Sequence, residues 1–297
     1  MKRLLTAITA IIIAAAPAVF AAETDLLVDM PTPPKEITRL DERCNYIVIN
    51  YWTTFNPKSS FSSLDRLNKT MAMFMNFTPY ATADTVFLAI DRLTQLVSKA
   101  SPENLITLAS MAEKHCYTDT CEIFSEDLYY PFVKAIATNK KAKGPLRDRF
   151  IAQYKRIENS RIGSKVENLE YILADGTKSN LDSISTEHIL MLFYDPECTD
   201  CRLANARLAA DFTLNALVRN KTLSIIALYP DEPDDAWRED AADMPKGWIV
   251  AALPDADTMF SIQHQPEIYY LDGEHTIKVK GVSVDNILNT FSQFLRK

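Results

Sequence analysis

The spacing of apolar residues changes once along this chain, near residue 160. From Ile37 to about Arg161, apolar residues recur every three or four positions, which is the spacing of one helix face. After Gly163 they alternate or form continuous runs, as they do in β-strands. A chain of 297 residues is long enough for two domains. We therefore expect an all-helical domain over 37–160, followed by an α/β domain over 161–297.

Turn signals divide each expected domain into short elements. The helices are expected near 37–51, 62–76, 82–99, 102–116, 126–138 and 145–159. In the second domain, strands are expected near 169–173, 189–194, 223–229, 248–253, 267–271 and 275–279, with helices over 198–218 and 283–295. Strands separated by helices predict βαβ units and a mostly parallel sheet.

Composition excludes several classes of function. The formal charge is −7, and nucleic acids and anionic lipids both require concentrated Lys and Arg, so neither is an expected partner. The chain has only six glycines and no Gly-rich phosphate-binding loop, which argues against a nucleotide site.

The start of the chain has the pattern of an export signal. Lys2 and Arg3 precede an apolar run over 4–20, which predicts a signal peptide over 1–21 that is removed on export. The alternative is a membrane anchor, but the run is shorter than the roughly 20 residues that a spanning helix needs. No other segment is expected to span a membrane. Residues 22–36 contain three prolines and are expected to form an extended leader outside the core.

A C-x-x-C pair, Cys198 and Cys201, lies just past the expected strand at 189–194 and begins the next helix. A helix N-terminus favours the thiolate of Cys198, and Cys201 lies one turn deeper, where it can close a disulfide. Cys198 is then the attacking thiolate and Cys201 the resolving thiol. A structural disulfide, half of a zinc site and an inert pair are the alternatives. The zinc site lacks a second pair of ligands with suitable spacing.

Four short motifs of the second domain have counterparts in a known family. They are Ile162-Gly163, Ala174-Asp175-Gly176, Leu192-Phe193-Tyr194 before the C-x-x-C pair, and the segment 265–273. On these motifs, residues 160–297 resemble the TlpA/ResA-like thioredoxins, which are exported thiol–disulfide oxidoreductases of the bacterial cell envelope.

This resemblance implies a thioredoxin-like fold with a central mixed sheet flanked by helices. It also implies that Pro266 is cis and faces the dithiol, so that Gln265 and Pro266 bind the substrate chain. The expected partners are protein thiols or disulfides in the cell envelope, together with a redox partner that recycles the dithiol. No organic cofactor and no metal are expected. The expected location is the periplasm or cell envelope of a Gram-negative bacterium.

The first domain also has a known counterpart. The segments 46–52 and 159–163 resemble an uncharacterised helical domain that is fused to such thioredoxins in exported proteins. This second resemblance implies the order of the two domains, but it implies no substrate.

The chain departs from the family where proton transfer is expected. Leu192 stands where thioredoxin has a buried Asp that accepts the proton of the resolving thiol, and Ala204 stands where ResA-like members have a Glu. The helix after the dithiol also lacks the usual kinking proline. Glu197, Asp200 or water are the remaining candidate proton acceptors. A non-catalytic binding protein with a thioredoxin-like fold and a structural disulfide is therefore the alternative function.

The remaining cysteines leave two readings open. Cys116 and Cys121 lie at the expected end of a helix, where either a structural disulfide or two free thiols fit an exported protein. His115 lies beside them, but one His and two Cys do not complete a tetrahedral metal site. Cys44 lies on an apolar helix face and is expected to be a buried, unreactive thiol.

Two further features lie near the expected dithiol. The acidic segment 231–241 follows the strand at 223–229, and we expect a solvated loop there. In a redox domain, such a loop is placed where it can select partner proteins by charge. His264 precedes the segment of Pro266 and is expected to be a surface loop residue, with a role in tuning the dithiol as the alternative.

Overall fold

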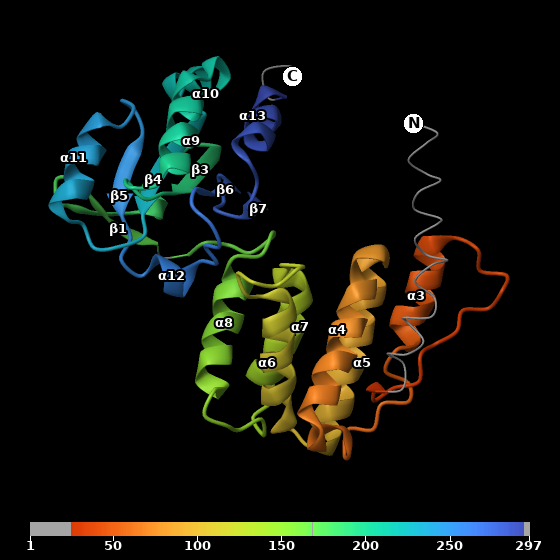
Figure 1. The fold of residues 1–297 in the computed structure, drawn as a ribbon. Coiled ribbons are helices and arrows are strands. Elements are labelled where there is room, and N and C mark those ends of the chain that lie inside the picture. Colours follow the sequence, from red (N-terminus) through yellow and green to blue (C-terminus); the bar gives the residue numbers. More distant parts are fainter. Residues whose placement is uncertain (1–24, 168, 294–297) are drawn as a thin grey trace. The chain divides into compact units, whose positions relative to one another are not determined.

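The computed structural model of the protein describes residues 25–167 and 169–293. The expected signal peptide lies outside these residues. The chain divides into two compact units between Tyr154 and Lys155, one built of helices and one built around a sheet (Figure 1). None of the helices in the described part of the chain is both long and apolar enough to cross a bilayer.

The helical unit contains amphipathic helices close to where the sequence predicts them. They are α3 (Leu40–Asn50), α4 (Leu64–Phe77), α5 (Ala83–Ala100), α6 (Asn104–Cys116), α7 (Glu126–Thr138) and α8 (Arg147–Asn159), with 3-10 turns η2 (Ser60–Ser62) and η3 (Thr78–Tyr80). The boundary between the units falls within α8. On α5, the buried residues Val86, Ile90, Leu93 and Val97 recur every three or four positions and face the core. The expected all-helical class of this unit is therefore confirmed.

The expected leader belongs in part to the core of the helical unit. Leu26 and Val28 are only 9% and 7% exposed, although the segment forms neither a strand nor an α-helix. Pro33 is buried as well, so the expectation that this segment lies outside the core is wrong at these three residues. The three prolines indicate irregular backbone, but they carry no information about which side chains find an apolar surface.

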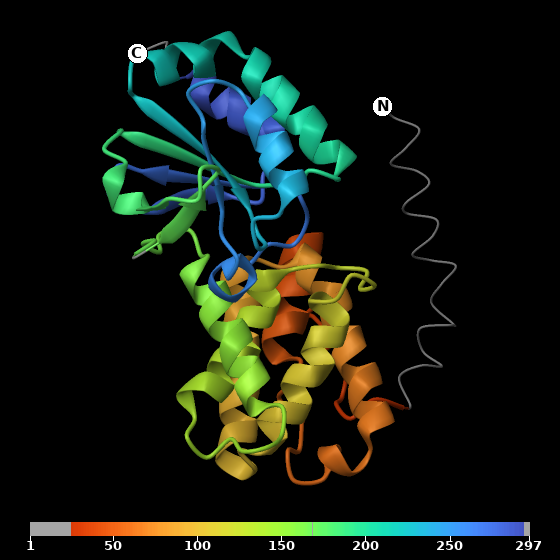
Figure 2. The same ribbon diagram turned by 90° about the vertical axis from the view of Figure 1, so that its left-hand side faces the viewer.

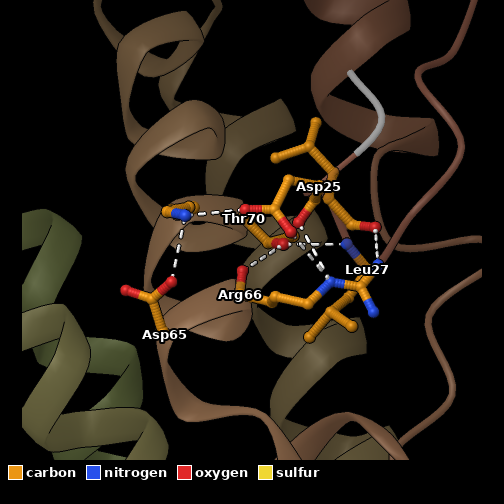
Figure 3. Close-up of polar contacts among 7 residues, drawn as sticks. Asp25, Leu27, Asp65, Arg66 and Thr70 are labelled. Atoms are coloured by element: carbon orange, nitrogen blue, oxygen red, sulfur yellow. Dashed lines mark hydrogen bonds and ion pairs between the residues drawn. The ribbon is translucent and has the colours of Figure 1, made fainter. Parts of the chain in front are cut away.

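Polar groups of α4 hold this segment in place (Figure 3). The Leu27 amide donates to Thr70 Oγ1 at 3.0 Å, and Arg66 Nη2 donates to the Leu26 carbonyl at 2.9 Å. Lys69 Nζ forms an ion pair with Asp25 Oδ2 at 2.6 Å. The segment lacks the regular backbone hydrogen bonds of a helix or sheet. These side chains therefore supply hydrogen bonds to its N–H and C=O groups.

The second unit is built around one mixed sheet with the strand order β2-β1-β5-β4-β3-β6-β7. Its strands are β1 (Glu170–Leu173), β2 (Lys178–Asn180), β3 (His188–Phe193), β4 (Leu223–Tyr229), β5 (Ile249–Ala252), β6 (Glu267–Asp272) and β7 (Ile277–Lys280). Only the β3–β4 and β4–β5 pairs are parallel. The mixed sheet implied by the resemblance is confirmed, and the expectation of a mostly parallel sheet is wrong. Tight turns join β1 to β2 and β6 to β7, which makes these pairs antiparallel.

Helices cover the sheet on both faces. The helical elements are η4 (Leu181–Ser183), α9 (Thr199–Ala210), α10 (Phe212–Arg219), α11 (Asp235–Asp243), α12 (Ala256–Met259) and α13 (Val284–Ser292) (Figures 1 and 2). Leu190 and Leu192 of β3 pack into the core that includes residues of α9, α10 and α13. Met191 points to the other core, which includes α12. The continuous apolar run of β3 is therefore explained by burial on both faces.

Two elements of this unit differ from the sequence predictions. The single helix expected over 198–218 is broken at Asp211, whose backbone is extended and whose side chain accepts a hydrogen bond from Leu214 N at 2.8 Å. A capping Asp thus makes the break without a proline. In the acidic segment, residues 231–234 form no helix and most of the acidic side chains are exposed, as expected, but α11 begins at Asp235 and its one large apolar side chain, Trp237, is fully buried.

We predict that Leu26→Ala destabilises the helical unit by about 2–3 kcal/mol, because it removes a buried side chain from a packed core. Urea unfolding followed by circular dichroism measures the effect. The matched control is Leu40→Ala, whose side chain is 61% exposed and whose loss should cost little. Equal midpoints for both variants and the wild type would show that the segment does not contribute to the core.

Candidate redox site

Cys198 occupies the position between β3 and the first turn of α9. It is the N-cap residue of α9, with φ −76° and ψ 116°, and its Sγ accepts a hydrogen bond from the Cys201 amide at 3.1 Å. The first amides of a helix have no partner within the helix, so they are free to stabilise a negative charge. The side chain is half-buried. The structure thus places Cys198 at the N-terminus of a helix with its side chain partly accessible.

Cys201 lies one turn deeper, and its side chain is fully buried. Burial is the main cause that raises the pKa of this thiol to about 12; the hydrogen bond with Cys198 contributes to the rise, whereas the backbone of Asp195 opposes it. The two thiols are therefore chemically different. Cys198 is accessible, while Cys201 is a protonated, protected thiol near neutral pH.

The segment of Pro266 lies beside the dithiol. The Gln265–Pro266 peptide bond is cis, as the resemblance implies, and the Cys198 thiol donates to the Gln265 carbonyl at 3.6 Å. The register of the sheet explains this proximity, because β3 and β6 are antiparallel and pair Phe193 with Glu267. The end of β3 and the start of β6 therefore lie side by side. It is the backbone of Gln265 that faces the nucleophile.

Aromatic side chains surround the buried thiol. Cys201 belongs to a cluster with Tyr194 and Trp237, both fully buried. Trp237 Nε1 donates to the Tyr194 hydroxyl at 3.0 Å, and the ring of Tyr229 stacks on that of Trp237 with centroids 6.0 Å apart. The sequence analysis missed Trp237 as a site residue. The sequence signal that could have indicated a helix here is Asp234, three positions before Trp237. Asp234 caps α11 by accepting a hydrogen bond from Trp237 N at 2.7 Å.

The two residues that replace the family's proton acceptors lie in apolar surroundings. Leu192 and Ala204 are both buried in the core on the face of the sheet that α9 covers. No carboxylate replaces them at these positions.

One carboxylate that the sequence analysis did not name acts on the buried thiol. The negative charge of Asp195, which is half-buried, raises the pKa of Cys201, although less than burial does. Glu197 and Asp200, the two acids that the sequence suggested, are exposed. Asp195 was missed because it precedes the motif by three residues and only the turn before α9 folds it back. His264 is exposed, as expected.

An acidic rim surrounds Tyr229 next to the dithiol. Burial is the main cause that raises the pKa of Tyr229, and four carboxylates raise it further. They are Asp195, Glu197, Asp231 and Asp234. Because β3 and β4 are parallel neighbours, the loops that follow them meet at one edge of the sheet. Anionic reactants should therefore be repelled from this edge, and cationic ones attracted.

The other three cysteines are free thiols in the structure, as are Cys198 and Cys201. The structural disulfide considered for Cys116 and Cys121 is thus not formed in it. Cys116 is fully buried and Cys121 half-buried, and burial raises the pKa of both Cys116 and Cys44.

His115 shares a hydrogen bond of 2.9 Å with Asn68 Oδ1. Within residues 25–167 and 169–293, no three His, Cys, Asp or Glu side chains are grouped as metal ligands.

The sequence comparisons identify a counterpart of the first unit. Residues 14–160 match the model of a family described as "Domain of unknown function (DUF5106)". This match agrees with the expectation of an uncharacterised helical domain before the thioredoxin-like domain. No curated protein matches the sequence.

Solved structures establish the fold of the chain. A thioredoxin-like protein from Bacteroides caccae ATCC 43185 is 20% identical, with a TM-score of 0.69 over 90% of this chain and 98% of that chain. A conserved protein of unknown function from Bacteroides fragilis is 31% identical over 44% of this chain and 98% of its own, with a TM-score of 0.43. The thioredoxin domain of a thiol-disulfide oxidoreductase from Bacteroides vulgatus is 24% identical over 45% and 97%, with a TM-score of 0.39. The first of these similarities shows the thioredoxin-like fold.

We predict that the acidic rim makes the reactivity of Cys198 depend on the charge of the reagent. In a Cys121→Ser background, the reaction with anionic Ellman's reagent should accelerate about three- to tenfold between 20 mM and 0.5 M salt, because salt screens the repulsion. The reaction with cationic cystamine should slow down. Stopped-flow absorbance and mass spectrometry measure the two rates.

The variant that tests the rim is Glu197→Gln with Asp231→Asn, which removes two charges and keeps similar shapes. Its control is Glu187→Gln with Glu274→Gln. Both are exposed acids, and they lie beside the ends of β3 and β6 that are away from Cys198. Only the rim variant should lose the salt dependence. If both variants lose it equally, the effect comes from net charge and not from the rim.

Proposed function

We propose that this chain, whose first domain matches an uncharacterised family and whose second domain has a thioredoxin-like fold, is a thiol–disulfide oxidoreductase. One observation carries the proposal. The half-buried sulfur of Cys198 accepts the amide of Cys201 at a helix N-terminus, while the Cys201 thiol is buried behind it. An accessible nucleophile and a protected second thiol are the two parts that disulfide exchange requires.

In the first step, the Cys198 thiolate attacks one sulfur of a partner disulfide. The partner's S–S bond breaks as the mixed disulfide forms, and the second partner sulfur leaves as a thiolate that takes a proton from water. The amides at the N-terminus of α9 stabilise the attacking charge.

In the second step, Cys201 gives its proton to water and its thiolate attacks the Cys198 sulfur, so that the partner sulfur leaves as a thiolate and takes a proton from water. The mixed disulfide breaks, the Cys198–Cys201 disulfide forms, and the partner leaves with both of its sulfurs reduced. Two electrons have moved from the dithiol to the partner. The same exchange in reverse oxidises a partner dithiol, and in either direction a second redox partner must restore the starting state.

The segment of Pro266 is the proposed contact for the partner chain. The Gln265 carbonyl accepts the Cys198 thiol at 3.6 Å, and this carbonyl is free for a backbone amide of the partner once Cys198 has lost its proton. An extended partner chain would then run beside the start of β6, with its cysteine at Cys198.

The proposed setting is the periplasm or cell envelope of a Gram-negative bacterium, with protein thiols and disulfides there as partners. The charge pattern of residues 1–21 supports export. An oxidising compartment is also where a protein disulfide exchange activity is needed.

We predict that Cys198→Ser abolishes insulin reduction driven by dithiothreitol, because no nucleophile remains. Cys201→Ser should instead accumulate a mixed disulfide with the partner, which non-reducing electrophoresis detects. Cys121→Ser, which alters the other half-buried cysteine, is the control and should retain wild-type turnover. Wild-type turnover in Cys198→Ser would contradict the proposal and leave the non-catalytic binding protein as the better function.

The pH dependence of the second step follows from the raised pKa of Cys201. The reactive form is the thiolate, and at every pH below a pKa of about 12 its fraction rises tenfold per pH unit. Release of a trapped partner should therefore accelerate steadily between pH 6 and pH 9. A rate that reaches a plateau near pH 7 would show that another group sets the titration.

A further inference from the structure

A buried acid that directly follows Pro266 has no role in the steps above. Glu267 begins β6 and is 7% exposed. Among residues 25–167 and 169–293, it is the one Asp or Glu that is buried. Burying a carboxyl group is costly unless polar contacts compensate, so the contacts of Glu267 indicate what it holds.

Glu267 lies on the face of the sheet that α12 covers. Tyr269, two residues further along β6, and Phe193, the partner of Glu267 on β3, both belong to the core on this face. Residues two apart in a strand point to the same face, so the Glu267 side chain points there too. The segment 260–266, which joins α12 to β6, leads directly to this side chain.

The carboxyl group of Glu267 closes the turn that carries Gln265. Its Oε2 accepts a hydrogen bond from the Gln263 amide at 3.4 Å. The Gln265 carbonyl, in the middle of this turn, accepts the Cys198 thiol at 3.6 Å. The carboxyl group and the carbonyl that faces the nucleophile therefore belong to one closed loop of backbone.

The turn is anchored on its other side at Ser261, which is buried. The Tyr269 hydroxyl donates to the Ser261 carbonyl at 2.8 Å, and Gln263 Nε2 donates to Ser261 Oγ at 2.7 Å. The contact between Gln263 and Glu267 lies between this anchor and the Gln265 carbonyl. It is therefore placed to control the course of the backbone toward Cys198.

The second oxygen of the carboxyl group packs against the residue after β7. Gly281 has a φ of +63°, and its amide donates to the Ile268 carbonyl at 3.0 Å. A Cβ atom at Gly281 would lie 3.3 Å from Glu267 Oε1, which is closer than an ordinary van der Waals contact. Glycine at this position thus leaves the space that the Glu267 carboxyl group occupies.

We propose that Glu267 is a positioning residue for the partner chain. Its carboxyl group, held between the Gln263 amide and Gly281, keeps the Gln265 carbonyl where a backbone amide of an extended partner binds. This inference rests on the proposed function, because it concerns recognition in the first step of the exchange. The favoured substrates are disulfides within a polypeptide chain, rather than small disulfides that have no backbone amide.

Two uncharged disulfides separate recognition of the chain from the reactivity of Cys198. The disulfide of acetyl-Gly-Cys-Gly-amide has backbone amides, and bis(2-hydroxyethyl) disulfide has none. With Cys121→Ser and Cys201→Ser, Cys198 forms a stable mixed disulfide, and mass spectrometry measures its rate of formation. In this background, Glu267→Ala should slow the reaction with the peptide disulfide about fivefold, because one hydrogen bond typically contributes about that factor. The reaction with the small disulfide should stay within about twofold.

Glycine variants test the same contact from its other side. Gly281→Ala should displace Glu267 Oε1 and slow the peptide reaction, and it should cause no further loss when combined with Glu267→Ala, because both act through one contact. Gly176→Ala is the matched control, since Gly176 also has a positive φ, +84°, but a Cβ atom there meets nothing within 4 Å. It should change neither rate. Glu267→Gln keeps an oxygen acceptor of the same reach and should retain the peptide rate.

The outcomes separate this inference from the proposed function. An unchanged peptide rate in Glu267→Ala would overturn the inference, as would equal slowing with both disulfides, which indicates a general change at Cys198. If Glu267→Ala does not fold, the comparison of Gly281→Ala with Gly176→Ala decides. If the protein without any substitution reduces the peptide disulfide no faster than dithiothreitol alone does, the proposed function itself fails.

Discussion

The pairing of β3 with both of its neighbours is the constraint on which the site depends. β3 is parallel to β4 and antiparallel to β6, so its carboxyl end meets the end of one strand and the start of the other. Cys198 follows β3, and the Gln265 carbonyl precedes β6, which brings them within 3.6 Å. A slip of one residue in the β3–β6 register would move every side chain of one strand to the opposite face and separate these groups.

The two thiols also differ in how deeply they are buried. Both belong to the same helical turn, yet Cys198 is half-buried and Cys201 is fully buried. Trp237 packs in the cluster that contains Cys201, and its helix α11 begins at the cap formed by Asp234. Cys201 thus lies inside the cluster that includes Trp237, while Cys198 packs against this cluster and stays half-buried.

Much of this architecture could be predicted from the sequence, because the relevant signals are local. The helices of the first unit follow from apolar spacing, and β3 follows from its continuous apolar run. The cis bond at Pro266 was implied by a motif of the family. The predictions that were wrong have different causes. The helix break at Asp211 and the antiparallel hairpins follow from a cap and from tight turns, which are local, whereas the burial of Leu26 and Trp237 depends on residues that are distant in the sequence.

The sequence by itself determined the two-part organisation, the position of the dithiol at a strand-to-helix junction and the acidic character of the loops around it. These features depend on residues that are neighbours along the chain. Only the tertiary structure decided which carboxylates act on the site, since the charge of Asp195 raises the pKa of Cys201 while Asp200 is exposed. The reason is physical: burial, and with it the pKa of a thiol or carboxyl group, depends on atoms that sheet register and helix packing bring together from distant parts of the chain.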